Sequence, residues 1–165
     1  KNLNHHKFPY IHYTNEAHGF RGSENKKSFN GNTIIFLLGN DVLSISDQMK
    51  CYLELIKICK GQGYKVVCKS HPRSDVKYNP KLFDQNLDPH IPFESMEIPY
   101  KFKVSLFTTS LIFEPTKSIS IENLIRNNLE VDKRFNLRAK FLRGFQDFDK
   151  INIPEDYVSF SNLIK

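Results

Sequence analysis

Two apolar runs separated by an amphipathic segment dominate the first half of the chain. Residues 33–38 (TIIFLL) and residues 64–69 (YKVVCK) are rich in β-branched and aromatic side chains, which is typical of strands buried on both faces. Residues 46–63 predict a helix between them, with Ser46 as its N-cap and a glycine at its end. The apolar stripe expected on this helix comprises Met49, Tyr52, Leu53, Ile56 and Cys59. Strand, helix and strand with short connections predict a βαβ unit and therefore a parallel sheet.

The rest of the chain repeats this pattern more loosely. Residues 102–110 (FKVSLFTTS) predict a third strand that ends in hydroxyl side chains, and residues 153–165 predict a last helix with Pro154 near its first turn. The other segments give shorter or mixed signals: polar residues at 76–88, a strand or turn at 90–98, a short helix or turn at 111–118, and helices or a strand–helix pair at 118–129 and 134–145. We expect an α/β fold, with a Rossmann-like parallel sheet flanked by helices, over residues 33–165.

Composition limits the classes of protein to consider. The 165 residues are 39% hydrophobic and 25% charged, as in one globular domain, and no apolar run approaches the roughly 20 residues that cross a bilayer. The net charge of +6 suits an anionic ligand, a nucleic acid or an acidic membrane surface, and does not choose among them. The cysteines are odd in number and lie in apolar patterns, which favours buried reduced thiols and a cytoplasmic protein.

Residues 1–32 are polar and irregular. They hold four of the six histidines, but no regular element sets the spacing of these side chains and no cysteine joins them, so we expect a linker or interdomain segment rather than a metal site. The chain begins with Lys1 rather than Met, and we interpret it as a piece of a longer protein.

Three predicted strands end in polar residues that could carry chemistry. These strand ends read GND at 39–41, SHPR at 70–73 and TTS at 108–110, and the carboxyl ends of parallel strands meet at one edge of a sheet. Pro72 restricts the backbone of His71, whose imidazole could bind or protonate a phosphate, or could merely cap a turn.

The hydroxyls of the TTS segment can also be interpreted in two ways. With the N–H groups of a following helix they could bind an anion, or they could form an ordinary N-cap. Glu94, in the apolar segment IPFESME, could accept a hydrogen bond from a ribose hydroxyl or cap a helix.

These motifs, in this order, resemble those of bacterial sialyltransferases with the GT-B architecture. KSHPR at 69–73 is similar to the family motif K-P-H-P-R except at Ser70, PFE at 92–94 matches a P-F-E element, and FTTS at 107–110 matches a Ser/Thr motif. The resemblance extends from residue 33 to about residue 115. It is closest to the lipooligosaccharide sialyltransferases of glycosyltransferase family 52, with the capsular polysialyltransferases as relatives, and it implies the C-terminal, donor-binding half of such an enzyme.

The resemblance implies a CMP-sialic acid donor and a role for each matching residue. His71, positioned by Pro72, would contact the CMP phosphate and assist its departure. Glu94 would lie near the ribose or cytosine, and Thr109 and Ser110 would hold the phosphate.

The resemblance also implies an acidic general base after the first strand. The family motif there ends in Gly, whereas this loop reads GNDVLSISD, with Gly39 and Asn40 expected beside the donor. Asp41 is the candidate base, and Asp47 is the alternative, although a carboxylate at that position also suits a helix N-terminus.

The implied activity is inverting, metal-independent transfer of sialic acid to a cell-surface glycan acceptor. We expect no cofactor apart from the donor substrate and no nucleic-acid partner. We also expect a location in the bacterial cytoplasm that is compatible with peripheral association with the inner membrane and with oligomers. One alternative is a CDP-polyol phosphotransferase of the teichoic-acid type, which shares the His-Pro and Ser-rich motifs. The other is a non-enzymatic polyanion-binding module, which would use the basic residues Arg134, Arg138, Lys140 and Arg143.

Overall fold

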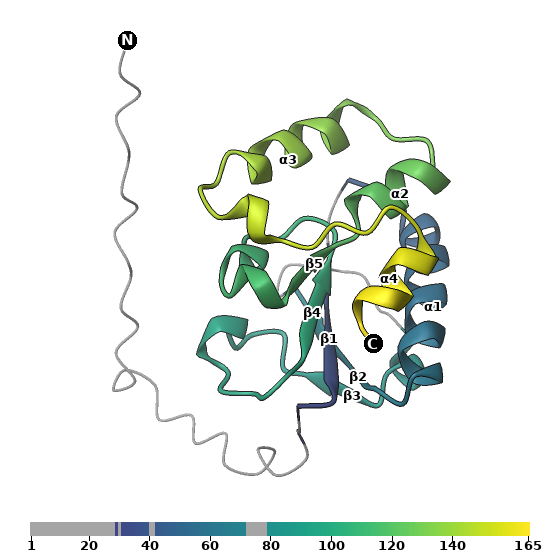
Figure 1. Ribbon diagram of the computed structural model, residues 1–165, viewed down its shortest axis with the longest axis vertical. Helices are drawn as coiled ribbons and strands as arrows, with labels where there is room; N and C mark the ends of the chain where they lie inside the picture. Colours follow the sequence, from purple (N-terminus) through teal and green to yellow (C-terminus); the bar gives the residue numbers. More distant parts are fainter. Residues whose placement is uncertain (1–28, 30, 40–41, 72–78) are drawn as a thin grey trace.

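A five-stranded, entirely parallel sheet forms the centre of the protein (Figure 1). The computed structural model describes residues 29, 31–39, 42–71 and 79–165. The strands are β1 (Thr33–Leu38), β2 (Lys65–Ser70), β3 (Gln85–Leu87), β4 (Phe102–Ser105) and β5 (Ser118–Ser120). Their order in the sheet is β3-β2-β1-β4-β5, so the chain reverses its direction of travel across the sheet between β1 and β4. The predicted Rossmann-like α/β fold is confirmed.

Within the described residues, four α-helices accompany the sheet. They are α1 (Ile45–Gly61), α2 (Glu122–Asn128), α3 (Lys133–Arg143) and α4 (Tyr157–Leu163). Helices α1 and α4 lie side by side along one face of the sheet, where the Gln62 side chain donates hydrogen bonds to the backbone and hydroxyl oxygens of Ser161 (Figure 1). Helix α3 lies across the carboxyl end of the sheet, and its Phe135 ring packs edge-on against Phe107, 4.7 Å away between ring centroids.

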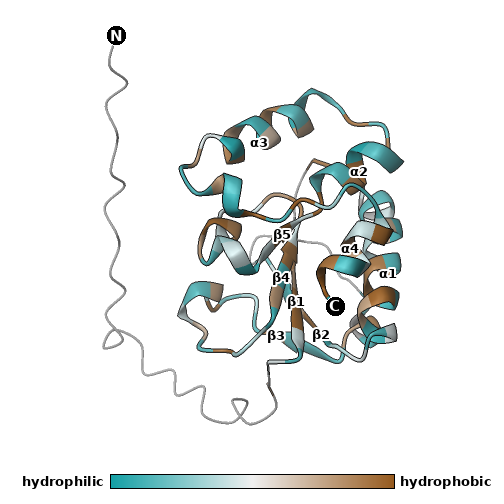
Figure 2. Cartoon of the chain, in the orientation of Figure 1, coloured by the Kyte–Doolittle hydropathy of each residue, from teal (hydrophilic) through white to brown (hydrophobic). Residues whose placement is uncertain are grey.

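Alternation along β1 explains why the whole strand is apolar. Ile34, Phe36 and Leu38 join the core cluster that the helices cover, while Ile35 and Leu37 belong to a second cluster on the opposite face. Successive side chains of a strand point to opposite faces, so a strand covered on both sides needs an unbroken apolar sequence (Figure 2).

The face opposite the helices is covered by irregular chain. From β3 at the edge, the chain returns to β4 beside β1 through a segment that contains the 3₁₀ turn Phe93–Ser95, and Phe93 is buried there. Two further 3₁₀ helices, Thr109–Ile112 and Pro115–Lys117, lie between β4 and β5. The apolar residues outside the sheet that cover this face are Phe29, Phe93, Met96, Ile98 and Tyr100. The segments that carry the predicted Glu94 and Ser110 therefore belong to short turns.

The structure corrects three details of the sequence analysis. The N-cap of α1 is Ser44 rather than Ser46, because the Ser44 hydroxyl accepts from the Asp47 backbone N–H at 3.1 Å. On α1 the fully buried leucine is Leu55, while Leu53 is only partly covered. A three-residue strand, β3, forms within the polar stretch 76–88, for which no strand was predicted, since it pairs with β2 through its backbone.

Cys51, Cys59 and Cys68 are buried free thiols, as predicted. Burial raises the pKa of Cys59 to about 12 and that of Cys68 to about 11, so both stay protonated near neutral pH. Among the residues that the structure describes, no helix is both long enough and apolar enough to cross a membrane.

Candidate functional site

The carboxyl ends of β1 and β2 bring two of the predicted site residues together. Leu38 pairs with Ser70 at the end of the ladder, and the backbone N–H of His71 donates to the Leu38 carbonyl at 2.8 Å. Gly39 therefore follows β1 directly beside His71. It has a φ of 116°, a conformation that other residues rarely adopt, which allows the chain to turn away at the end of the strand. His71 itself is exposed to solvent.

Glu94 and Ser110 contact each other directly. The Ser110 hydroxyl donates a hydrogen bond to Oε1 of Glu94, although the two residues lie 16 positions apart. Glu94 comes from the 3₁₀ turn Phe93–Ser95 and Ser110 from the turn that follows β4. The predicted P-F-E element and Ser/Thr motif thus form one unit at the carboxyl end of β4, next to the point where the strand order reverses.

The segment after β4 was expected to be a short helix or a turn, and the structure shows short 3₁₀ turns. Residues Thr109–Ile112 form a four-residue 3₁₀ helix, and the Thr108 hydroxyl accepts from the backbone N–H of Ser110 at 3.3 Å. This contact agrees with the N-cap interpretation of the hydroxyls: Thr108 caps a short 3₁₀ helix, and the chain then proceeds to another short turn and to β5 without an α-helix in between. The exposed Thr109 and the half-buried Ser110 are left as the candidate polar groups.

The remaining predicted site residues, Asn40, Asp41 and Pro72, lie outside the described residues. The alternative base, Asp47, lies in the first turn of α1, where it accepts from the Ser44 hydroxyl at 2.7 Å and pairs with Lys50 at 3.1 Å. The hydrogen bonds from Ser44 and Lys50 lower the pKa of Asp47. A carboxylate with a lowered pKa is a weaker proton acceptor, so its contacts fit the start of a helix better than general base catalysis.

A buried lysine on β4 connects the two turns of the site, and the sequence analysis missed it. Lys103 is only 1% exposed, and its ammonium group donates to the backbone carbonyl of Phe113. The same group lies 5.8 Å from the centroid of the Phe93 ring. It therefore contacts both the turn that contains Glu94 and the segment that follows Ser110.

A second lysine lies at the end of β2. Lys69 is 6% exposed, and its ammonium donates to the backbone carbonyls of Ser70 at 3.2 Å and Pro89 at 2.9 Å. Burial lowers the pKa of Lys69, and it lowers the pKa of Lys103 to about 8, while the negative charge of Glu94 opposes both shifts. Glu94 is thus within electrostatic reach of two buried ammonium groups.

A signal for these lysines is present in the sequence. Each lies in a largely apolar segment, Lys69 at the end of YKVVCK and Lys103 in FKVSLF, at a position where a strand covered on both faces should carry an apolar side chain. A charged residue at such a position must find partners inside the protein, and both lysines find them in backbone carbonyls of the turns.

The lowered pKa of Lys103 predicts a specific pH dependence of stability. Below pH 8 the ammonium is charged in both states, and the folded chain bears the full cost of burying it. Between pH 8 and the ordinary pKa of 10.5 the folded chain releases the proton while the unfolded chain keeps it, so this cost falls. We expect the free energy of unfolding of Lys103→Met, relative to the unaltered protein, to fall by ~1–3 kcal/mol as the pH rises from 7 to 10.

Denaturant unfolding at several pH values measures this difference. Lys133→Met, at an exposed position of α3, is the control for the loss of one positive charge. A difference for Lys103→Met that stays constant or grows with pH would contradict the buried, easily deprotonated ammonium.

Comparison with known proteins agrees with the motifs. A family model described as alpha-2,8-polysialyltransferase matches residues 1–119 of the 165, which include β1 to β4 and every predicted site residue. No curated protein and no solved structure matches the chain. The resemblance to sialyltransferases is confirmed at this level, while the narrower assignments to glycosyltransferase family 52 and to a C-terminal half stay predictions. The chain belongs to the alpha-2,8-polysialyltransferase family.

Proposed function

We propose that this domain binds CMP-sialic acid and forms the donor-binding half of an inverting sialyltransferase of GT-B architecture. The observation that carries the proposal is the hydrogen bond between Ser110 and Glu94, which unites two predicted donor motifs at the sheet edge that also bears His71. Ligands of open parallel α/β sheets bind at this edge, where the strand order reverses. Membership of the polysialyltransferase family supports the choice of sialyl transfer.

The proposed reaction uses groups of this edge to stabilise the leaving CMP. As the acceptor hydroxyl attacks the anomeric carbon of the donor, negative charge develops on the CMP phosphate. His71 hydrogen-bonds or protonates this phosphate, and a carboxylate, with Asp41 as the candidate, removes the proton of the attacking hydroxyl. One direct displacement inverts the anomeric centre. We propose no metal ion in this scheme. A single phosphate can be stabilised by His71, by the hydroxyls of Thr109 and Ser110, and by the positive charge of the buried Lys69 and Lys103.

The contact between Ser110 and Glu94 suggests how the donor is admitted. A serine hydroxyl has one proton, and here that proton is donated to Glu94. For Ser110 to hold the phosphate, this bond has to be exchanged for one to the ligand. A ribose hydroxyl can then donate to Glu94 in its place, so the carboxylate keeps a partner in both states.

The acceptor belongs to the proposal as well. The family match favours an acceptor that ends in sialic acid over lipooligosaccharide, and we propose a cell-surface glycan of that kind. We further propose a bacterial cytoplasmic location, at or near the inner membrane, where the nucleotide-sugar donor is available.

Thermal unfolding with nucleotides tests the choice of donor. At ~100 times its dissociation constant CMP should raise the unfolding temperature by ~5–10 °C, more than CDP, UDP or inorganic phosphate. Ser110→Ala should reduce this rise because a phosphate donor is lost, whereas Thr116→Ala, which removes a hydroxyl from an exposed turn nearby, should preserve it. Strongest stabilisation by CDP would point instead to a CDP-polyol phosphotransferase, and no stabilisation by CMP would overturn the proposal.

A further inference from the structure

Helix α3 has two faces of different character. Its buried face consists of Phe135, Ala139 and Leu142, at helical spacing. The residues of a second face, Arg134, Leu137, Arg138 and Phe141, are also three and four positions apart. Leu137 and Phe141 on this second face are 57% and 56% exposed, so these large apolar side chains contribute little to the core.

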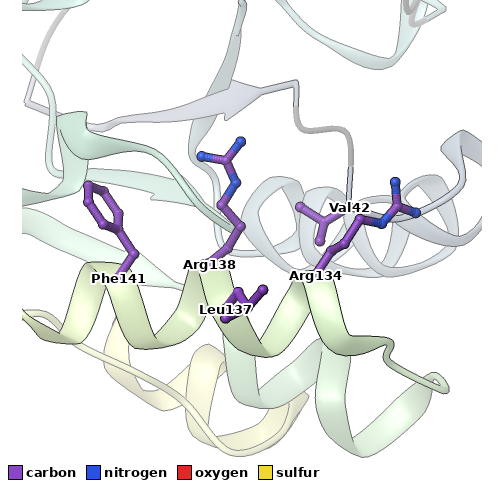
Figure 3. Close-up of a pocket in the computed structure, with 5 residues that line it drawn as sticks. All are labelled: Val42, Arg134, Leu137, Arg138 and Phe141. Atoms are coloured by element: carbon purple, nitrogen blue, oxygen red, sulfur yellow. The ribbon is translucent and has the colours of Figure 1, made fainter.

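This second face lines a cavity at the carboxyl end of the sheet. The cavity has a volume of about 370 Å³, and its lining residues are Val42, Arg134, Leu137, Arg138 and Phe141. Figure 3 shows the two guanidinium groups projecting from α3 toward the side on which Val42 lies. Val42 follows β1, and Phe107 after β4 packs on α3, so the cavity is next to the reversal point of the sheet. Its size is within the usual range of small-ligand sites.

The charge of the cavity favours an anion. None of the described residues that line it is acidic, and the ionisable residues of α3 are all basic: Lys133, Arg134, Arg138, Lys140 and Arg143. Arg143 is occupied by the buried Glu122, at 2.6 Å. Arg134 pairs at 3.0 Å with the half-exposed Asp132, and an ion pair in contact with water is readily exchanged for another anion.

The combination of two guanidiniums with apolar side chains restricts the kind of anion. A planar guanidinium binds a carboxylate through two parallel hydrogen bonds, and the exposed leucine and phenylalanine offer contact to an apolar surface of the same ligand. A sialic acid residue supplies both, since it carries one carboxylate on a sugar ring with apolar patches. A lipid bilayer would meet protruding apolar residues on a convex surface, whereas these residues line a hollow.

We propose that the cavity beside α3 binds a sialic acid residue of the acceptor glycan, with its carboxylate held by Arg134 and Arg138 and its ring against Leu137 and Phe141. The inference rests on the proposed function and assigns the acceptor to a place next to the donor site. The acceptor carboxylate would be anchored by residues that take no part in holding CMP.

Binding of a short α-2,8-linked sialic acid oligomer to the whole chain, measured by calorimetry, tests the proposal. The double variant Arg134→Gln/Arg138→Gln should bind the oligomer at least tenfold more weakly, because both carboxylate partners are lost. Phe141→Ala should weaken binding severalfold through loss of the apolar contact. The matched control Lys133→Gln/Lys140→Gln removes the same charge from exposed positions of α3 that do not line the cavity, and should change the affinity less than twofold.

Several outcomes would overturn this site. Equal losses in the arginine and lysine double variants would show a general polyanion surface, and a synthetic RNA should then compete with the oligomer. Binding to phosphatidylglycerol vesicles that needs the arginines, without binding of the oligomer, would show a membrane surface. CMP affinity separates this inference from the proposed function: it should be unchanged in the arginine variant, and failure of oligomer binding with intact CMP binding removes the acceptor site alone.

Discussion

His71→Ala should lower the rate of sialyl transfer by ~10²–10⁴-fold and weaken CMP binding to this domain, with little change in thermal stability. The imidazole is exposed at the end of β2, so its removal leaves no cavity in the core. The bond from the His71 backbone N–H to the Leu38 carbonyl does not depend on the side chain and persists in the variant. The lower transfer rate should therefore result from weaker stabilisation of the leaving phosphate and not from unfolding.

Two further variants refine this prediction. His71→Asn keeps a hydrogen-bond donor and should retain more CMP affinity than His71→Ala, while it fails to supply a proton to the leaving group. His90→Ala removes another exposed imidazole, between β3 and the Phe93–Ser95 turn, and should leave transfer and CMP affinity near the unaltered values. Unchanged transfer and unchanged CMP affinity in His71→Ala would show that the site lies elsewhere.

Phe36→Ala should reduce the free energy of unfolding by about 3–5 kcal/mol, the largest effect expected on stability. Phe36 is fully buried in the middle of β1, with its ring edge-on to Tyr52 at 5.9 Å and tilted against Phe83 at 6.4 Å. Its truncation leaves a cavity between the central strand and α1 that the surrounding elements can fill only in part. Because marginal stability is normal for a domain of this size, much of the protein would be unfolded near physiological temperature.

Denaturant unfolding followed by circular dichroism measures this loss. Phe113→Ala is the matched control, since Phe113 is 52% exposed and accepts the hydrogen bond of Lys103 through its backbone carbonyl, which the variant keeps. Its effect should stay within about 0.5 kcal/mol, as for most surface substitutions. Comparable losses in the two variants would contradict the assignment of β1 to the centre of the core.

The parts of the fold that were predicted correctly are those with strong and continuous patterns. The first strand matches residues 33–38, and the second is shifted by one residue to 65–70, because burial on both faces demands an apolar run that few other structures need. Strand β3 has only Gln, Asn and Leu, and it exists through backbone pairing with β2, which no local pattern reveals. The choice between Ser44 and Ser46 as N-cap depends on which hydroxyl accepts a hydrogen bond from a free backbone N–H in the first turn, and this depends on the local backbone conformation.

The sequence was sufficient to predict which residues belong to the candidate site, but not which of them contact each other. Motif order identified Glu94 and Ser110 as separate candidates, but their hydrogen bond depends on two turns whose geometry is set by packing against the sheet. The sequence left a short helix or a turn open after the hydroxyls, and only the structure shows that the segment Thr109–Ile112 is a 3₁₀ helix that ends after four residues. Lys103 escaped notice because a lysine in a strand normally reaches water, and only the covering turns make it a buried cation.

The unequal covering of the sheet has a consequence for how this protein could diversify. Helices α1 and α4 pack on one face, whereas two of the proposed donor contacts, Glu94 and Ser110, come from short 3₁₀ turns. Turns of this kind accept substitutions and changes of length more readily than helices. A descendant could therefore acquire a different donor by changing residues around Glu94 and Ser110 alone, while its helical side, and with it the ability to fold, was inherited intact.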